Sequence, residues 1–323
     1  MIIDGIFECS DDGKTLLKCL DKEIVSAAIP SSVESIGKFA FAYCSSLRSV
    51  NIPDSVTSIG GRAFSDCESL ESVNIPDSVK SLGWGTFYLC WSLRSINIPD
   101  SVTSIPDSTF FACRYLESVN IPESVESIGK SAFAYCTSLK SVNVPNSVTF
   151  IGNQAFSDCE TLESVYLPES VKSIGECVFA GCRSLKSVEI STHNENFASD
   201  KAVIYSKDRS VLLLYSAGKT DSSFDIPDSV VSVETYAFSD CTSLRFVNIP
   251  NSVRTIGDGA FNACDHLESV YFPDSVTSIG IYAFSGCKLL KTANIPDSAC
   301  SELAFDKDVE IIRRPVFAPL KRI

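Results

Sequence analysis

The feature that most constrains this chain is a segment that recurs every 23 residues. Residues 69–87 read Ser-Leu-Glu-Ser-Val-Asn-Ile-Pro-Asp-Ser-Val-Lys-Ser-Leu-Gly-Trp-Gly-Thr-Phe, and near copies follow one another along most of the 323 residues. The prolines that keep this step are Pro30, Pro53, Pro76, Pro99, Pro122, Pro145 and Pro168 and, after a break, Pro227, Pro250, Pro273 and Pro296. The cysteines that keep it are Cys44, Cys67, Cys90, Cys113, Cys136, Cys159 and Cys182 and, after the break, Cys241, Cys264 and Cys287. Such a step predicts one structural unit per repeat, stacked so that neighbouring units bury a shared core.

Each repeat predicts a strand, a stop and a return segment. Leu70, Val73 and Ile75 follow the pattern Leu-x-x-Val-x-Ile, in which alternation turns the Val and Ile side chains inward. Pro76 ends the strand because it cannot donate to a ladder. The Ala-Phe-x-x-Cys segment predicts a short helical turn that packs back on the sheet. This pattern is typical of a leucine-rich repeat solenoid, so we expect one parallel β-sheet with short helical or turn segments on the convex side.

Interruptions of the repeat predict five parts. These parts are an N-terminal cap hairpin at 1–28, a first repeat array at 29–190, an inserted hairpin at 191–225, a second array at 226–298, and a C-terminal cap and tail at 299–323. In the first cap, Asp12 and the glycine after it form a hairpin signal. The insert repeats that pattern, with Tyr205 where Cys9 lies and Leu212 where Leu16 lies. The insert is therefore expected to be a second hairpin or a hinge, and the C-terminal part is expected to add a closing strand and a basic tail.

The formal net charge of -13 limits the kinds of partner. A nucleic-acid backbone or an anionic membrane needs clustered Lys and Arg, so neither is expected as a partner. No apolar run is long enough to span a membrane. The first residues lack the basic end and apolar stretch of a signal peptide, which leaves a cytosolic protein and a fragment of a longer chain both open.

The repeat Ile-Pro-Asp-Ser-Val-Thr-Ser-Ile-Gly-x-x-Ala-Phe-x-x-Cys-x-x-Leu resembles the BspA-like leucine-rich repeat family over about residues 28–298. The resemblance implies a right-handed solenoid of the kind found on bacterial or protozoan surfaces. It also implies a location at the cell surface or outside the cell, a protein ligand such as a host or matrix protein, and no catalytic activity.

The sequence carries no motif for catalysis or for a cofactor. His193 and His266 are its two histidines, and neither lies in a metal or nucleophile motif. It has no glycine-rich phosphate loop, and most Ser and Asp residues recur at repeat positions where turn chemistry accounts for them. We therefore expect neither enzymatic activity, nor a cofactor, nor a bound metal.

The ladder cysteines allow two interpretations. Their position suits a small buried apolar side chain, which favours free core thiols. Adjacent coils are close enough to consider disulfides, but an even ladder gives each thiol two equivalent neighbours and no obvious partner. Cys177 lies off the ladder, and we expect it to be the most exposed thiol.

Two columns of charged residues follow the repeat. The residue after each strand-opening Leu alternates in sign, which we interpret as structural pairing between adjacent strands. The members of this alternating column are Arg48, Glu71, Arg94, Glu117, Lys140, Glu163, Lys186, Arg245, Glu268 and Lys291. The residue after Pro is acidic in most repeats, at Asp54, Asp77, Asp100, Glu123, Glu169, Asp228, Asp274 and Asp297. Ser31, Asn146 and Asn251 interrupt this second column, so ordinary turn chemistry is favoured over a calcium ladder.

The strand face is one candidate binding surface, expected to be exposed and concave. Its polar position is Asn in most repeats but changes to Tyr166, Glu189 and Tyr271, and Phe246 replaces a Ser near Tyr271. Exposed aromatic residues on a polar ladder are typical hot spots, although they can also serve only to cover a neighbouring side chain. The candidate residues on this concave face are Asn97, Asn120, Asn143, Tyr166, Glu189, Phe246 and Tyr271.

A second candidate surface lies on the opposite side. Trp84, Tyr88 and Trp91 are spaced to share one face of a helical turn, and the next repeat adds Phe111 and Tyr115 beside them. These rings either form an exposed aromatic patch or wedge between coils. The sequence thus predicts a non-enzymatic protein-binding module for adhesion or interaction, a monomer or a weakly self-associating one. The alternative is a structural spacer or self-assembly module of a larger surface protein.

Overall fold

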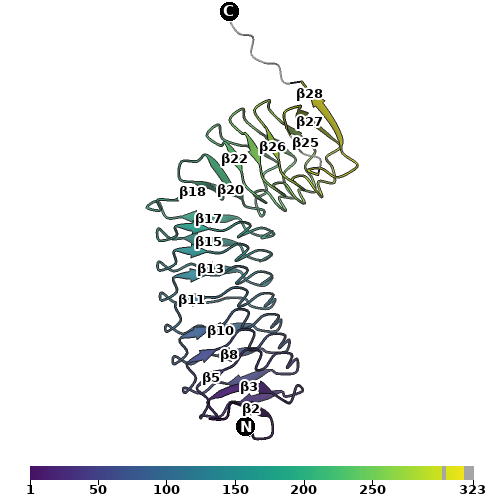
Figure 1. Cartoon of the computed structure of the whole chain (residues 1–323). Helices are drawn as coiled ribbons and strands as arrows, with labels where there is room; N and C mark the ends of the chain where they lie inside the picture. The colour runs from purple at the N-terminus through teal and green to yellow at the C-terminus, as the bar shows by residue number, and fades with distance from the viewer. Residues whose placement is uncertain (300–302, 316–323) are drawn as a thin grey trace, which may run out of the picture. The chain divides into compact units, whose positions relative to one another are not determined.

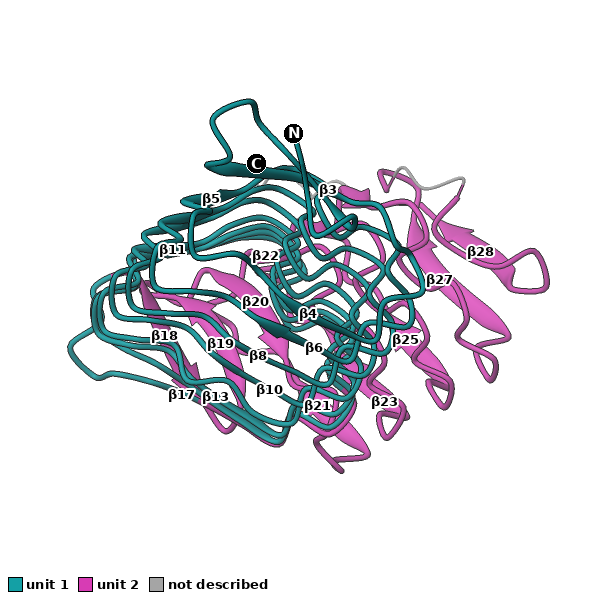
Figure 2. Cartoon of the chain, turned by 90° about the horizontal axis from the view of Figure 1, so that it is seen from below, with its two compact units in different colours: residues 1–182, 189–195 teal, residues 183–188, 196–323 magenta. Residues whose placement is uncertain are grey.

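The structure is a computed structural model that describes residues 1–299 and 303–315. Its contacts group into two compact units, coloured separately in Figure 2. The first unit holds residues 1–182 and 189–195, and the second holds residues 183–188 and 196–323. Within the described ranges every regular element is a β-strand and none is a helix. Each unit is a solenoid of parallel-stranded coils, which confirms the predicted fold class.

On one side of the first unit every coil but the one at Asn120 carries the strand predicted from Leu-x-x-Val-x-Ile, and we call this side the strand face (Figure 1). Neighbouring strands pair in parallel with a 23-residue offset, as Val50 pairs with Val73. Side chains alternate along each strand, so Ser49 and Asn51 are exposed while Val50 is buried. The strands are β4 (Ser26–Ala28), β6 (Ser49–Asn51), β8 (Ser72–Asn74) and β10 (Ser95–Asn97), followed by β13 (Ser141–Asn143), β15 (Ser164–Leu167) and β17 (Ser187–Ile190).

A second side carries short strands that the repeat pattern did not predict. The two residues at this position of each coil pair in parallel with the equivalent residues of the neighbouring coils. Ser35 and Ile36, for example, pair with Ser58 and Ile59. The short strands are β5 (Ser35–Ile36), β7 (Ser58–Ile59), β9 (Ser81–Leu82), β11 (Ser104–Ile105), β12 (Ser127–Ile128), β14 (Phe150–Ile151) and β16 (Ser173–Ile174). At the N-terminal end, the antiparallel strands β1 (Ile2–Ile3), β2 (Phe7–Cys9) and β3 (Thr15–Cys19) cover the first coil.

The third side, which we call the turn face, differs from the predicted helical turns. Two residues of each coil, four positions apart, take left-handed backbone angles, such as φ 53° at Arg62 and φ 59° at Asp66. The amides of Arg62, Phe64 and Asp66 donate to carbonyls of the next coil at 2.8, 2.9 and 2.8 Å. Hydrogen bonds between coils thus replace those that a helix would make within one coil. Trp84 and Tyr88 supply two of these carbonyls and therefore lie on this ladder, not on a helix.

Stacked phenylalanine rings run through the core beside the Val and Ile rows. In the first unit the stack extends from Phe41 to Phe179, and Phe87 and Phe110 within it lie 5.7 Å apart with planes 2° from parallel. In the first unit each ladder thiol from Cys67 to Cys182 donates to the carbonyl of a Phe 26 residues earlier, as Cys90 does to Phe64 at 3.1 Å. A thiol fits here because it is small and apolar yet satisfies a buried carbonyl.

The thirteen described cysteines are free thiols, and twelve of them are buried. Cys177 is the half-buried exception, and burial raises its pKa to about 11. Burial likewise raises the pKa of the Cys67 thiol to about 12. Cys300 lies outside the described residues.

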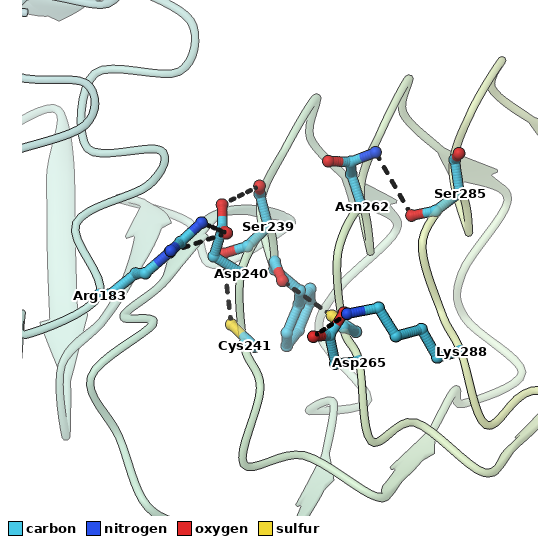
Figure 3. Close-up of polar contacts among 10 residues, drawn as sticks. Arg183, Ser239, Asp240, Cys241, Asn262, Asp265, Ser285 and Lys288 are labelled. Atoms are coloured by element: carbon cyan, nitrogen blue, oxygen red, sulfur yellow. Dashed lines mark hydrogen bonds and ion pairs between the residues drawn. The ribbon is translucent and has the colours of Figure 1, made fainter. Parts of the chain in front are cut away.

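The second unit begins with an antiparallel hairpin and continues with the same coil. Its strands are β18 (Phe197–Asp200), β19 (Val203–Ser206), β20 (Val211–Tyr215), β21 (Ser223–Asp225), β22 (Ser232–Val233), β23 (Phe246–Asn248), β24 (Thr255–Ile256), β25 (Ser269–Tyr271), β26 (Ser278–Ile279), β27 (Thr292–Pro296) and β28 (Glu310–Arg314). Figure 3 shows polar contacts within it, among them the guanidinium of Arg183 on the carboxylate of Asp240 at 3.0 Å. Lys288 and Asp265, one repeat apart, lie 2.7 Å from each other. The strand β28 closes the strand face beside β27, while the basic tail expected at 316–323 lies outside the described residues.

Candidate functional site

Trp84 is the centre of an exposed group of rings on the turn face of the first unit. The equivalent position one coil earlier is Gly61, and a β-carbon there would lie 2.8 Å from Nε1 of Trp84. Because Gly61 has no side chain, the indole of Trp84 has room to lie over the preceding coil. The Trp84 ring contacts the ring of Phe39, two coils earlier, edge-to-face, with ring centroids 6.2 Å apart. Both rings remain accessible, at 44% exposure for Trp84 and 47% for Phe39.

Arg62 joins this ring pair to the next aromatic residues. Its guanidinium carbon lies 4.9 Å from the ring centre of Trp84 and 4.4 Å from that of Tyr88, a cation–π geometry on both sides. Tyr88 stacks on Phe111 at 4.8 Å, and Phe111 meets Tyr135 edge-to-face at 5.3 Å. We call the continuous set of six residues the aromatic band: Phe39, Arg62, Trp84, Tyr88, Phe111 and Tyr135.

The band ends at Tyr135, which is 45% exposed. Its hydroxyl hydrogen-bonds the carboxylate of Asp158, and the negative charge of that carboxylate raises the pKa of Tyr135. A phenol that stays protonated keeps its hydroxyl as a hydrogen-bond donor. The band therefore presents apolar ring edges together with polar groups, a composition typical of protein-binding hot spots.

Two residues of the predicted outer patch lie outside this band. Trp91 is half-buried, and the guanidinium carbon of Arg114 lies 5.3 Å from the centre of the Trp91 ring. The Nε1–H of Trp91 has no hydrogen-bond acceptor among the described residues. Tyr115 is 54% exposed and lies 5.8 Å from Arg94. Among described residues no ring contact connects either side chain to the band. The structure thus brings together Trp84, Tyr88 and Phe111 and leaves the other two as separate arginine–ring pairs.

Sequence reasoning missed half of the band. Phe39, Arg62 and Tyr135 come from three different coils and belong to two slots of the repeat. Phe39 and Arg62 share a slot that other repeats fill with Ser, Gln, Gly, Cys or Tyr, and Tyr135 shares the slot of Asp66 and Tyr43. Comparing these slots down the repeats shows that they are variable, but it does not single out the three residues. Their contact with Trp84 and Phe111 depends on the turn-face ladder, which the helical expectation did not contain.

The strand-face candidates form rows, as the register requires. Asn97 and Asn120 lie opposite each other at an isolated bridge, and Asn143 lies opposite Tyr166 on β15. All four are exposed, and so is Glu189 on β17. In the second unit Phe246 is 45% exposed and Tyr271 58% exposed, on the neighbouring strands β23 and β25. Arg314 lies 5.0 Å from the Tyr271 ring and Arg245 lies 6.0 Å from the Phe246 ring.

A surface hollow of about 450 Å³ interrupts the strand face between β10 and β13. Strand pairing is reduced there to the single bridge of Asn97 with Asn120. The residues that line the hollow are Asp100, Asn120, Ile121, Pro122, Glu123, Ser124 and Asn143. Polar side chains therefore dominate its wall.

The histidines take part in simple local contacts. Nδ1 of His266 lies 2.5 Å from the carbonyl of Thr242, and Nδ1 of His193 lies 4.0 Å from the Glu169 carboxylate. In the described part of the chain, His, Cys, Asp and Glu form no group of three or more that is able to hold a metal ion. The described residues likewise include no helix long and apolar enough to cross a membrane.

Comparison with known proteins identifies relatives of this architecture. The family model described as a BspA type leucine rich repeat region matches six copies, over residues 19–137, 103–204 and 216–318. The crystal structure of a leucine rich cell surface protein from Faecalibacterium prausnitzii is 31% identical with a TM-score of 0.80, over 98% of this chain and 95% of that one.

Two further solved structures share the fold. A leucine-rich repeat protein from Bacteroides ovatus is 25% identical with a TM-score of 0.51, over 95% of this chain and 90% of that one. Another from Eubacterium ventriosum is 20% identical with a TM-score of 0.58, over 96% and 84%. No curated protein sequence matches this chain.

Proposed function

Because the chain belongs to the BspA-type leucine-rich repeat family, we propose that it is a non-enzymatic protein-binding module whose main contact surface is the aromatic band. Leucine-rich repeat proteins of this kind generally serve as interaction or surface modules. A similar protein is described as a cell surface protein, and on that basis we propose an adhesive role at a cell surface, toward a host or matrix protein.

The observation that carries this proposal is the continuity of the aromatic band. Large rings on a soluble surface normally lie singly, whereas Phe39, Trp84 and Tyr135 are each more than 40% exposed and linked by ring contacts. The coils themselves do not need these rings, since other repeats place Gly61, Asp66 or Ser at the same slots. A spacer that only separates other domains has no use for such a band.

The test compares two double variants on purified matrix proteins immobilised on a sensor chip. Trp84→Ala with Tyr135→Ala should weaken binding at least about tenfold, because central aromatic anchors carry most of the energy of an interface. The matched control is Tyr166→Ala with Tyr271→Ala, which removes two exposed rings from the strand face. The control pair should retain nearly the full affinity.

Three other results would count against the proposal. Loss of binding only in the Tyr166 and Tyr271 pair would move the site to the strand face. Equal affinity in all three proteins would exclude both surfaces. Absence of binding by the unmodified chain would favour the spacer. Circular dichroism and thermal unfolding of each variant establish that the fold is unchanged.

A further inference from the structure

The strand β28 is the last strand of its sheet in the described part of the second unit, beside β27 (Figure 2). It pairs with β27 in parallel, with Ile312 opposite Asn294, and no described strand lies along its other side. A strand edge of this kind presents unpaired amides and carbonyls to any further strand. We call this side of β28 the open edge.

The hydrogen bonds to β27 determine which backbone groups lie at the open edge. The amide of Glu310 donates to the carbonyl of Lys291 at 2.8 Å. At the other end of the strand, the carbonyl of Arg314 accepts from the amide of Asp297 at 2.9 Å. Successive residues of a strand direct their amides and carbonyls to opposite sides, so every second residue of β28 faces β27. The residues whose backbone groups face the open edge are therefore Ile311 and Arg313.

The side chains at the open edge are apolar, although two arginines belong to the strand. Ile311 is 39% exposed and Ile312 43% exposed. Nη1 of Arg313 donates to a backbone carbonyl of its own unit at 3.1 Å, and Nη1 of Arg314 lies 2.8 Å from the carboxylate of Asp274. Edge strands usually prevent association with charges that project from the edge. In β28 both guanidinium groups are engaged within the unit instead.

Ile311 also lies at an uncovered end of the core. Its partner on β27 is Ala293, which is fully buried, and so is Ile295 on the same side of that strand. Paired residues of neighbouring strands lie on the same face of a sheet, so Ile311 continues the buried row. The last coil of a solenoid normally presents a polar outer face. A buried row that ends in an exposed isoleucine therefore leaves apolar surface for another chain to cover.

A second copy of β28 matches the open edge when it lies antiparallel. Facing residues with free backbone groups exchange both hydrogen bonds in such a pair, so Ile311 faces Arg313 of the second copy. This register puts Ile312 opposite its own counterpart, on the two-fold axis. It also puts the acidic end of the strand, Glu310, opposite the basic end, Arg314, of the second copy. A parallel arrangement would put ends of like charge side by side, which is destabilising.

We propose that this chain forms a two-fold symmetric dimer in which the open edge of β28 pairs antiparallel with β28 of a second copy. Because both copies use the same edge, association stops at the dimer. The pairing belongs to the second unit and does not involve the aromatic band, so this dimer and the proposed function can fail separately.

Sedimentation equilibrium of the full chain tests for the dimer. The apparent mass should rise from 35.0 kDa toward twice that value as the concentration increases from about 1 to about 200 μM. Ile312→Lys places like charges opposite each other at the axis and should weaken the dimer at least about tenfold. Ile311→Pro removes an amide that β27 does not use, and it should weaken the dimer as strongly while the coil stays folded.

The matched control is Ile281→Lys. Ile281 is 49% exposed in the same unit and follows β26 instead of lying on β28. Its dimer dissociation constant should stay within about twofold of that of the unmodified chain. Circular dichroism and thermal unfolding show whether each variant keeps the fold.

Disulfide cross-linking provides a second measurement that does not depend on weakening the dimer. The two copies of residue 312 face each other at a separation that a disulfide bridges, so Ile312→Cys should cross-link to itself on oxidation with diamide. Asn294→Cys is exposed as well but lies one strand further from the axis, on β27. It should give no more covalent dimer than the unmodified chain.

Four results would overturn the inference. They are a chain that stays monomeric at every concentration, a dimer that Ile312→Lys and Ile311→Pro leave intact, equal cross-linking by Ile312→Cys and Asn294→Cys, and an apparent mass that keeps rising beyond that of a dimer. The last result would indicate an open, head-to-tail contact, because a pairing between identical edges closes at two copies.

Discussion

At the scale of single residues, the glycine that follows most of the short strands lies in close approach to the neighbouring coil, whereas Pro106 and Glu234 follow the other two. A β-carbon on Gly83 would lie 2.1 Å from the amide nitrogen of Gly61, and one on Gly60 would lie 2.7 Å from the backbone of Gly37. Neither Gly60 nor Gly83 has a positive φ, so backbone freedom is not the reason for glycine at these positions. The limit is the space left by the neighbouring coil.

Substitution of this glycine tests the argument. Gly83→Ala should destabilise the chain by about 1–3 kcal/mol, because the added methyl group meets backbone atoms that have little freedom to move. Urea denaturation followed by circular dichroism measures the change. Ser81→Ala, at an exposed neighbouring position, serves as control and should stay within about 0.5 kcal/mol. If the two variants are equally stable, the coils have room that the structure does not show.

At the scale of elements, the N-terminal hairpin and the inserted hairpin share one construction. Cys9 pairs with Leu16 in the first and Tyr205 with Leu212 in the second, and a register shift precedes each pair. This is the correspondence that the sequence predicts. The last strand of each hairpin then pairs in parallel with a short strand of the next coil. These pairs are β3 with β5 in the first unit and β20 with β22 in the second.

The turn of the inserted hairpin depends on one carboxylate. Asp208 accepts hydrogen bonds from the hydroxyl of Ser206 at 2.6 Å and from the amide and hydroxyl of Ser210 at 3.0 and 2.8 Å. These donors favour the charged form and lower its pKa to about 2. Because the folded value is depressed, the stabilisation is present above the unfolded value of 3.8 and is lost as the pH falls toward 2.

This prediction is checked by carboxyl-detected NMR titration, in which Asp208 should show a midpoint well below 3.8. Asp208→Asn should speed amide hydrogen exchange at Ser210 and leave the matching turn at Asp12 unchanged. Asp12 provides the internal comparison, since its own serine and backbone donors lower its pKa too. A midpoint of 3.8 or above for Asp208 would contradict the hydrogen-bonded turn.

At the scale of the whole molecule, each coil is stabilised mainly by the coils on either side of it. The buried Phe110 stacks on Phe87 at 5.7 Å and on Phe133 at 5.1 Å, and it belongs to the first unit. In such an array, stability is approximately a sum of coil and nearest-neighbour terms. A core defect should therefore spread along the solenoid over a limited distance.

Phe110→Ala provides the corresponding experiment. Loss of the ring should cost about 3–5 kcal/mol. In hydrogen–deuterium exchange read by mass spectrometry, protection should fall most in the coils around residues 87–133. Residues 226–298 should keep nearly normal exchange. A uniform loss of protection across both units would show that the chain unfolds as one cooperative body.

The sequence by itself determined the 23-residue coil, the inward Val and Ile rows, the two hairpins and the closing strand near residue 310. These features follow from local rules, because alternation, proline and turn residues act within a few positions of one another. Only the tertiary structure decided that the return segment is a ladder of left-handed turns. The same holds for the band from Phe39 to Tyr135. The reason is that these contacts join residues one or more coils apart, so they depend on hydrogen bonds and spacing between coils that no single repeat contains.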